Sequence, residues 1–256
     1  MKLRRISLAV LSVLLSAVTA LSGFMVYTQL SDRQKEKEEF DTLAEMVEVT
    51  PEKPNDETAV PTDDTSKPVR DLSGLFSQNG DCIGWLCIPD TAVNYPVMHT
   101  PENPQKYLRR SFYGEYSQSG VPFLDRRCGL NSDNLIIYGH NMRDGSMFGQ
   151  LVYYRDEDFY KAHPTFTFDT LYEHATWQVV AALDTALGAD EQPYYTFFDA
   201  ANKLDWQRRV EAITALALYD TGVTPEYGTQ LLPLSTCGDP RPDTDTRFAI
   251  LAMRVG

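Results

Sequence analysis

The chain has 256 residues and a mass of 28.9 kDa, the size of one large domain or two small ones. Hydrophobic residues make up 43% of the sequence, enough for a sizeable core, and this excludes a chain that is disordered throughout. A net charge of −13 argues against a nucleic-acid-binding protein, and four cysteines are too few for a disulfide scaffold.

Residues 1–30 predict a membrane anchor. The charged side chains here are Lys2, Arg4 and Arg5, and the 22 residues from Ile6 to Tyr27 carry no charge. An apolar helix of that length can cross a hydrocarbon core of about 30 Å. The basic residues are expected to stay in the cytoplasm, which places the rest of the chain outside the cell membrane.

A cleaved signal peptide is the alternative for this segment, because Val18, Thr19 and Ala20 offer small residues at a plausible cleavage site. We favour an uncleaved anchor, since apolar residues continue through Phe24 and Val26. Both interpretations export the protein.

Residues 31–70 predict a polar helix followed by a linker. The segment holds 12 acidic and six basic side chains. Phe40, Leu43 and Val47 recur at helical spacing, so we expect a helix to about Glu48. Four prolines follow before residue 70 and predict an extended, solvated linker.

Residues 71–256 predict one folded domain that is mainly β. One helix is expected ahead of the fifth strand, capped by Asp199 or Asn202 and extending to about Tyr219. Many short strands with few helices favour a closed or nearly closed β-barrel. The expected strands are Ile83–Ile88, Leu135–Tyr138, Thr165–Phe168, Thr176–Leu183, Gln230–Thr236 and Arg247–Val255.

Three chemically active side chains stand at predicted strand ends. Cys237 follows an apolar strand, and Arg247 opens the next one after nine residues without a strand signal. If these strands pair antiparallel, the two residues lie side by side at one rim of the sheet. His140 follows another strand at a glycine turn. Strand ends on a rigid scaffold hold reactive groups in place and leave them accessible.

Each of these residues alone has an ordinary structural interpretation: a buried thiol, a surface histidine and an ion-pair partner. Together they favour acyl transfer through a thioester. Cys237 is the nucleophile in that chemistry, and His140 exchanges its proton and later protonates a leaving amine. Arg247 keeps its charge and can stabilise a developing oxyanion.

The motifs around these residues resemble those of sortases. Leu234–Cys237, read Leu-Ser-Thr-Cys, followed by Arg247 resembles the active-site strand pair of that family. Tyr138–Gly149 is similar to the histidine segment of class B sortases, and the resemblance extends over 71–256. Four upstream segments follow the opening strands of that class in order: Ile83–Leu86, Ile88–Thr91, Tyr95–Val97 and Val121–Asp125.

The resemblance implies a closed eight-stranded barrel with one long helix before the cysteine strand. It implies a membrane-anchored cysteine transpeptidase of Gram-positive bacteria that cleaves a sorting signal near the C-terminus of a secreted protein. The acceptor would be an amine of a cell-wall precursor or a pilin. Two alternatives stay open: a cysteine peptidase that releases its product to water, and a non-catalytic surface domain.

The same resemblance assigns roles to five positions. Cys237 is the expected nucleophile, His140 the general acid and base, and Arg247 the stabiliser of the carbonyl or oxyanion. Ser235 matches a position that lines the substrate groove, and Asn103 matches a groove asparagine. The chain departs from the family at Pro233, where threonine is usual, and at Gly238, and these departures bear on groove specificity.

No metal or cofactor is expected. Cys82 and Cys87 lack the spacing of zinc ligands, and we expect two buried thiols there rather than a disulfide. The acidic run Asp156–Asp158 is interpreted as the solvated start of a helix rather than a calcium site.

Overall fold

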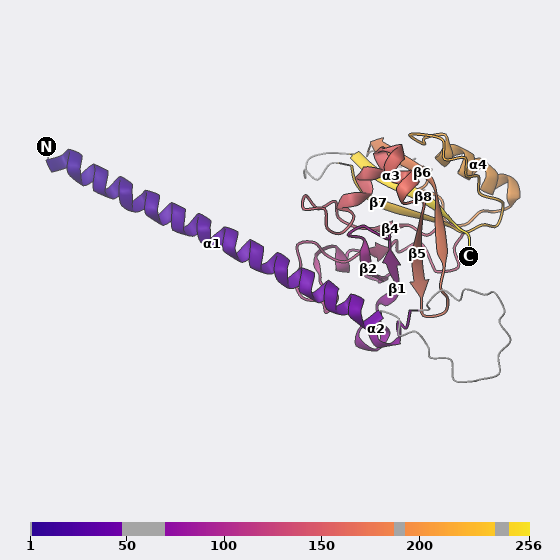
Figure 1. Ribbon diagram of the computed structural model, residues 1–256, viewed down its shortest axis with the longest axis horizontal. Coiled ribbons are helices and arrows are strands. Elements are labelled where there is room, and N and C mark those ends of the chain that lie inside the picture. The colour runs from indigo at the N-terminus through magenta and orange to yellow at the C-terminus, as the bar shows by residue number, and fades with distance from the viewer. Residues whose placement is uncertain (1, 48–69, 187–192, 239–245) are drawn as a thin grey trace. The chain divides into compact units, whose positions relative to one another are not determined.

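The computed structural model describes residues 2–47, 70–186, 193–238 and 246–256 (Figure 1). The chain forms two compact units, Met1–Thr42 and Leu43–Gly256. The first unit lies within the helix α1 (Lys2–Val47), whose end agrees with the predicted limit near Glu48. By length and composition, its stretch Leu14–Val47 could cross a membrane. The predicted proline-rich linker falls on 48–69, outside the described residues.

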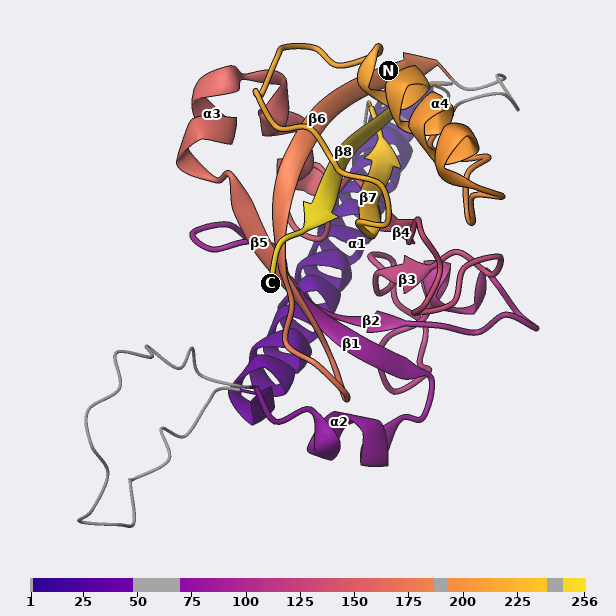
Figure 2. The same cartoon turned by 90° about the vertical axis from the view of Figure 1, so that its right-hand side faces the viewer.

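The second unit is a closed barrel of eight strands in the order β1-β2-β3-β4-β7-β8-β6-β5 (Figures 1 and 2). The β2–β3 and β4–β7 pairs are parallel, and the other pairs are antiparallel. The mainly β, closed barrel is therefore confirmed. The strands are β1 (Cys82–Cys87), β2 (Asn94–Met98), β3 (Phe123–Leu124), β4 (Ile137–Tyr138), β5 (Thr165–Thr170), β6 (Thr176–Ala186), β7 (Leu231–Cys237) and β8 (Thr246–Arg254).

The core extends to both faces of the β6–β8–β7 sheet. Six successive residues of β7 are buried, as are five in β8. Strands covered on both faces read as continuous apolar runs rather than alternating ones. The outer cover includes the helix α4 (Lys203–Thr214), which packs Trp206, Val210 and Ile213 into the same cluster as Leu231. This packing makes the sheet that carries Cys237 a rigid support.

One of the two residues predicted to cap α4 does so. The side chain of Asn202 accepts a hydrogen bond from the backbone N–H of Asp205 and caps the helix. Asp199 has a different role, because its carboxylate accepts from the backbone N–H of Asp133.

The end of α4 comes earlier than predicted, at Thr214 rather than near Tyr219. The apolar residues beyond it belong to an extended segment along β6. There the Leu218 N–H donates to the Ala182 carbonyl over 2.9 Å, and Ala217 forms an isolated bridge with Leu183. Of the apolar side chains beyond Thr214, Ala217 packs against the same cluster as α4, whereas Leu216 and Leu218 are exposed, so the apolar spacing overestimated the length of the helix.

The other helices are short. Asp156 caps α3 by accepting from the Asp158 N–H, which confirms that the acidic run starts a helix. Across the described residues, no group of three or more His, Cys, Asp and Glu side chains could hold a metal ion. These helices are α2 (Ser73–Gln78), η1 (Lys106–Arg109), η2 (Gly149–Arg155) and α3 (Glu157–Ala162).

Cys82 and Cys87 are free thiols, so the disulfide alternative is wrong. They stand at opposite ends of β1, about 16 Å apart at the rise of a strand, and a disulfide needs Cα atoms within about 7 Å. Cys82 is buried as expected, whereas Cys87 is half-buried.

Pro233 lies within β7 opposite Leu251 of β8. On the opposite edge of β7, Leu234 and Ser235 pair with β4, and an isolated bridge joins Leu231 to Asn134. The missing N–H of proline therefore falls in a gap of the β4–β7 ladder.

Candidate active site

The sheet register brings three strand ends to one rim. In the parallel β4–β7 pair, Tyr138 lies opposite Ser235, and in the antiparallel β7–β8 pair Cys237 lies opposite Arg247. His140 and Cys237 each follow the first pair by two residues, so the register places them next to each other. The predicted adjacency of Cys237 and Arg247 agrees with the structure.

The Cys237 thiol lies beside a permanent positive charge. Arg247 Nη1 donates a hydrogen bond to Cys237 Sγ at 3.3 Å, and the cysteine is partly exposed. The surroundings of the buried cysteines differ: burial raises the pKa of Cys82 to about 12 and that of Cys128 to about 11. Those two thiols remain protonated and inert at neutral pH.

His140 is held in one orientation by η1. Its Nε2 lies 2.9 Å from the Leu108 carbonyl, and its own carbonyl accepts from the Phe148 N–H. Because a carbonyl only accepts, Nε2 carries a proton, and Nδ1 is the nitrogen left to accept one. Burial lowers the pKa of His140, the bond to Leu108 raises it, and the charge of Arg109 lowers it further, with a net decrease.

Glycine immediately before the histidine is required by close packing. A Cβ at Gly139 would meet the Phe148 ring at 2.6 Å. The Gly139 carbonyl accepts from Thr236 Oγ1 at 2.8 Å, and its N–H donates to the Ser235 carbonyl at 3.2 Å. These bonds extend the β4–β7 contact beyond the paired residues as far as His140.

Two side chains near Cys237 were missed by the sequence analysis. Asn141 Nδ2 donates to the Cys237 carbonyl at 2.7 Å, and Arg155 Nη2 donates to the Gly238 carbonyl at 2.9 Å. Both residues lie in or just after the histidine segment, which was the available signal. The predicted loop between Cys237 and Arg247 lies largely at 239–245, outside the described residues.

The two residues predicted to line the substrate groove have different surroundings from His140, Cys237 and Arg247. Ser235 is 2% exposed, and its hydroxyl lies 3.2 Å from the Tyr194 hydroxyl. Asn103 is exposed in the turn before η1, where its backbone bonds Thr100 and Lys106. In the described structure, no hydrogen bond joins Asn103 to the residues at the rim.

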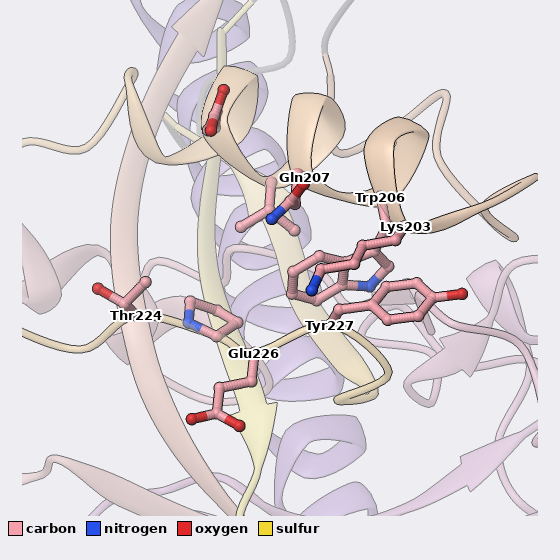
Figure 3. A pocket seen from close by; sticks show the side chains of 9 residues that line it. Lys203, Trp206, Gln207, Thr224, Glu226 and Tyr227 are labelled. Carbon is pink, nitrogen blue, oxygen red and sulfur yellow. The ribbon is translucent and has the colours of Figure 1, made fainter.

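A cavity of about 430 Å³ lies elsewhere, between α4 and the loop 224–227 (Figure 3). Its lining includes Trp206 and Tyr227, whose rings meet edge to face with centroids 6.0 Å apart. None of the residues that line it comes from β4, β7 or β8. The chemistry of the rim is therefore separate from this cavity.

Comparison with known proteins identifies the family. No protein-family model matches the sequence. Sortase B of Listeria monocytogenes is 32% identical over 182 residues, which cover 69% of this chain and 71% of that protein. The chain belongs to the sortase B family. Sortase B of Staphylococcus aureus is 27% identical over 255 residues, or 98% of each chain.

Solved sortase B structures share the fold of this sortase. The Bacillus anthracis enzyme in complex with AAEK1 has a TM-score of 0.72 and 28% identity, covering 88% of this chain and 99% of that one. The S. aureus sortase B–substrate complex has a TM-score of 0.66 and 30% identity, covering 72% and 84%. A sortase B complexed with triglycine has a TM-score of 0.67 and 25% identity, covering 89% and 97%.

This sortase is thus a cysteine transpeptidase, as its relatives are. The family membership excludes the non-catalytic surface domain that the sequence left open. It also confirms the class B resemblance found in the cysteine and histidine segments.

Proposed function

We propose that this sortase cleaves a sorting signal near the C-terminus of a secreted protein through a thioester on Cys237, and then passes the acyl group to an amine. The observation that carries the proposal is the 3.3 Å contact between Arg247 Nη1 and Cys237 Sγ. It supports Cys237 as nucleophile because a fixed cation stands where negative charge develops on sulfur and on the attacked carbonyl oxygen.

The first half of the reaction forms the thioester. The thiol proton of Cys237 passes to Nδ1 of His140, and Sγ bonds to the scissile carbonyl carbon. The carbonyl oxygen becomes an oxyanion that accepts hydrogen bonds from Arg247. When the intermediate collapses, the C–N bond breaks and His140 returns its proton to the leaving nitrogen.

The second half transfers the acyl group. An amine attacks the thioester carbon and gives a proton to His140, and the departing sulfur of Cys237 recovers a proton from the imidazole. The solved complexes of related enzymes, one with a substrate and one with triglycine, support a peptide substrate and an amine acceptor. We propose a cell-wall precursor or a pilin as the source of that amine.

Ser235 and Asn103 are proposed to line the substrate groove, on the resemblance to the family. Ser235 stands two residues before Cys237 on the same strand. Its hydroxyl is buried and lies 3.2 Å from the Tyr194 hydroxyl, so contact between a substrate and Ser235 requires a local rearrangement at this residue.

We propose that the apolar part of α1 anchors this sortase in the cell membrane, with the catalytic domain outside. Residues 1–30 would form the cytoplasmic basic end and anchor, 31–70 the polar helix and linker, and 71–256 the catalytic domain. Support comes from the exposed apolar side chains of α1 and the basic residues before them.

The test uses the full chain in detergent with peptide libraries built on Asn-Pro-x-Thr and Leu-Pro-x-Thr-Gly, with and without triglycine. Mass spectrometry should show an acyl adduct on Cys237 and a product joined to triglycine. Cys237→Ala should keep the fold and lose all cleavage. Cleavage by Cys237→Ala would refute the nucleophile, and a product released only to water in the presence of triglycine would refute amine transfer.

A further inference from the structure

The turn that carries Cys237 is held by three successive hydrogen bonds to the histidine side of the rim. Thr236 donates from its side chain to the Gly139 carbonyl. The Cys237 carbonyl accepts from Asn141 Nδ2 at 2.7 Å, and the Gly238 carbonyl accepts from Arg155 Nη2 at 2.9 Å. Both carbonyls at the nucleophile are thus held by side chains more than 80 positions earlier in the chain.

The Arg155 guanidinium is itself fixed in place. Its Nε donates to Asp184 Oδ2 at 2.7 Å, and the group lies over the Phe248 ring, 5.0 Å from the centroid. Asp184 and Phe248 face each other across the β6–β8 ladder. The planar fork of arginine can bridge a carboxylate and a carbonyl at the same time. Arg155 therefore links the Gly238 carbonyl to the longest strand pair of the barrel.

Glycine at position 238 makes room for this contact. The Gly238 N–H donates to the Thr246 carbonyl at 3.0 Å, which continues the β7–β8 ladder by one step. A Cβ on Gly238 would stand 2.8 Å from Thr246 Oγ1 and 3.4 Å from Arg155 Nη2. The residue after the nucleophile is small because strand β8 and the Arg155 guanidinium both approach it.

We propose that Asn141 and Arg155 are positioning residues for the transfer reaction. They hold the peptide carbonyls of Cys237 and Gly238 and so keep the Cys237 sulfur aligned with Arg247 and His140. The inference rests on the proposed role of Cys237 as nucleophile. β7 ends at Cys237, so side-chain bonds, rather than further β4–β7 pairing, fix the turn. A misplacement of about 1 Å can cost roughly 100-fold in rate.

The chain contains a matched control for Arg155. Arg209 Nε donates to Asp205 Oδ2 at 3.0 Å, its Nη1 donates to the Thr196 carbonyl at 3.4 Å, and its guanidinium lies over the Phe197 ring at 5.3 Å. The side-chain exposures are 36% for Arg209 and 39% for Arg155. Both arginines thus bond a carboxylate and a backbone carbonyl and lie over an aromatic ring. Only Arg155 bonds a carbonyl in the turn that carries Cys237.

The experiment compares Arg155→Met, Arg155→Lys and Asn141→Leu with Arg209→Met in the full chain in detergent. The substrate is the peptide mixture described above with triglycine. Each of the three test variants should lower kcat about 10- to 100-fold and leave KM within about twofold. Arg209→Met should keep the wild-type kcat and lower Tm by as much as Arg155→Met does.

Arg155→Lys separates position from charge. Lysine keeps the positive charge but cannot bridge Asp184 and Gly238 with a planar fork. Restoration of kcat by Arg155→Lys would overturn the positioning role and leave a purely electrostatic one. A wild-type kcat in both Arg155→Met and Asn141→Leu would overturn the proposal. A loss of kcat that is fully explained by the fraction of unfolded protein in each variant would overturn it as well.

A second measurement needs no sorting signal. The rate of alkylation of Cys237 by iodoacetamide is followed at one fixed pH by peptide mass spectrometry. In Arg155→Met and Asn141→Leu this rate should differ from that of the wild type and of Arg209→Met, because the sulfur is no longer held against Arg247. A purely structural role would leave the alkylation rate at its wild-type value.

The role of Cys237 as nucleophile and the positioning role of Asn141 and Arg155 can be refuted by different results. Activity in Cys237→Ala would refute the nucleophile and with it the reaction that the turn serves. An inactive Cys237→Ala, together with normal turnover and an unchanged alkylation rate in Arg155→Met and Asn141→Leu, would refute the positioning role alone.

Discussion

Arg247 and Arg254 stand near opposite ends of β8, and their surroundings differ. Arg254 makes a bidentate ion pair with Glu173, at 2.9 and 2.7 Å. Arg247 donates to the Cys237 sulfur and, in the described part of the chain, has no carboxylate partner. The Arg254 charge is thus paired with a carboxylate, whereas Arg247 Nη1 donates to the Cys237 sulfur and to the Thr246 carbonyl.

Arg247→Lys should lower kcat on the order of 100- to 1,000-fold, the usual cost of losing an oxyanion donor. Lysine retains the charge but does not reproduce the planar set of donors. Single-turnover kinetics with the peptide mixture would measure the loss. Arg254→Lys is the control on the same strand and should turn over normally. Near-normal turnover in Arg247→Lys would remove Arg247 from its role.

The pH dependence follows from the burial of His140, which lowers its pKa below the ordinary value of 6.5. A histidine acts as a base when neutral, so a lower pKa extends activity toward acid. The acid limb of kcat/KM should therefore have its midpoint below 6.5. Arg109→Gln removes one charge that lowers the pKa, so the midpoint should rise. A fall or no change in Arg109→Gln would contradict this account.

At the scale of elements, β1 and β5 to β8 were predictable because long apolar or alternating runs leave few alternatives. β3 and β4 contain two residues each, and their positions came from the resemblance or from part of a longer apolar run. The parallel pairing of β4 with β7 could not be derived from periodicity, since partner choice depends on the whole barrel.

The candidate site also contains residues that the sequence predicts and residues that it does not. His140, Cys237 and Arg247 lie at or next to strand ends, where sequence patterns are informative, and family motifs support them. Asn141 and Arg155 lie in or just after the histidine segment, but their partners are 96 and 83 positions away, and local sequence patterns do not specify such distant pairs. Ser235 was expected in a groove, and its burial against Tyr194 depends on a loop whose course the sequence does not specify.

Asn202→Ala tests the start of α4. Loss of the cap to the Asp205 N–H should lower the free energy of unfolding by about 1 kcal/mol. Urea denaturation followed by circular dichroism would measure it. Asn202→Ser keeps an acceptor and should recover most of the stability. Equal losses in both variants would show that the side-chain acceptor is not what stabilises this end of α4.

At the scale of the molecule, the end of α1 belongs to the second compact unit. Leu43 and Val47 are fully buried, and the Gln78 amide donates to Met46 Sδ at 3.3 Å. The boundary that composition placed near residue 70 therefore differs from the limit of the compact unit at Leu43. Burying each such side chain contributes about 1.5–3 kcal/mol.

Two truncations separate stability from catalysis. A chain of residues 71–256 should remain soluble and keep the kcat of the full protein, because the rim residues all lie within it. A chain of residues 43–256 should have the higher Tm, since it retains Leu43 and Val47. Thermal melts and peptide cleavage measure both. A folded but inactive 71–256 chain would mean that the preceding segment takes part in catalysis.

The parallel β4–β7 pairing also bears on when the groups of the rim come together during folding. Thr236 and Gly139, which meet at the rim, are separated by 97 positions, and β8 must follow before Arg247 reaches Cys237. Such long-range contacts form late, because the entropy of closing the intervening chain is lost before they stabilise anything. The contact between Arg247 and the Cys237 sulfur therefore exists only once β7 and β8 have paired. If Cys237 is the nucleophile, as we propose, completion of the fold is what places the arginine beside it.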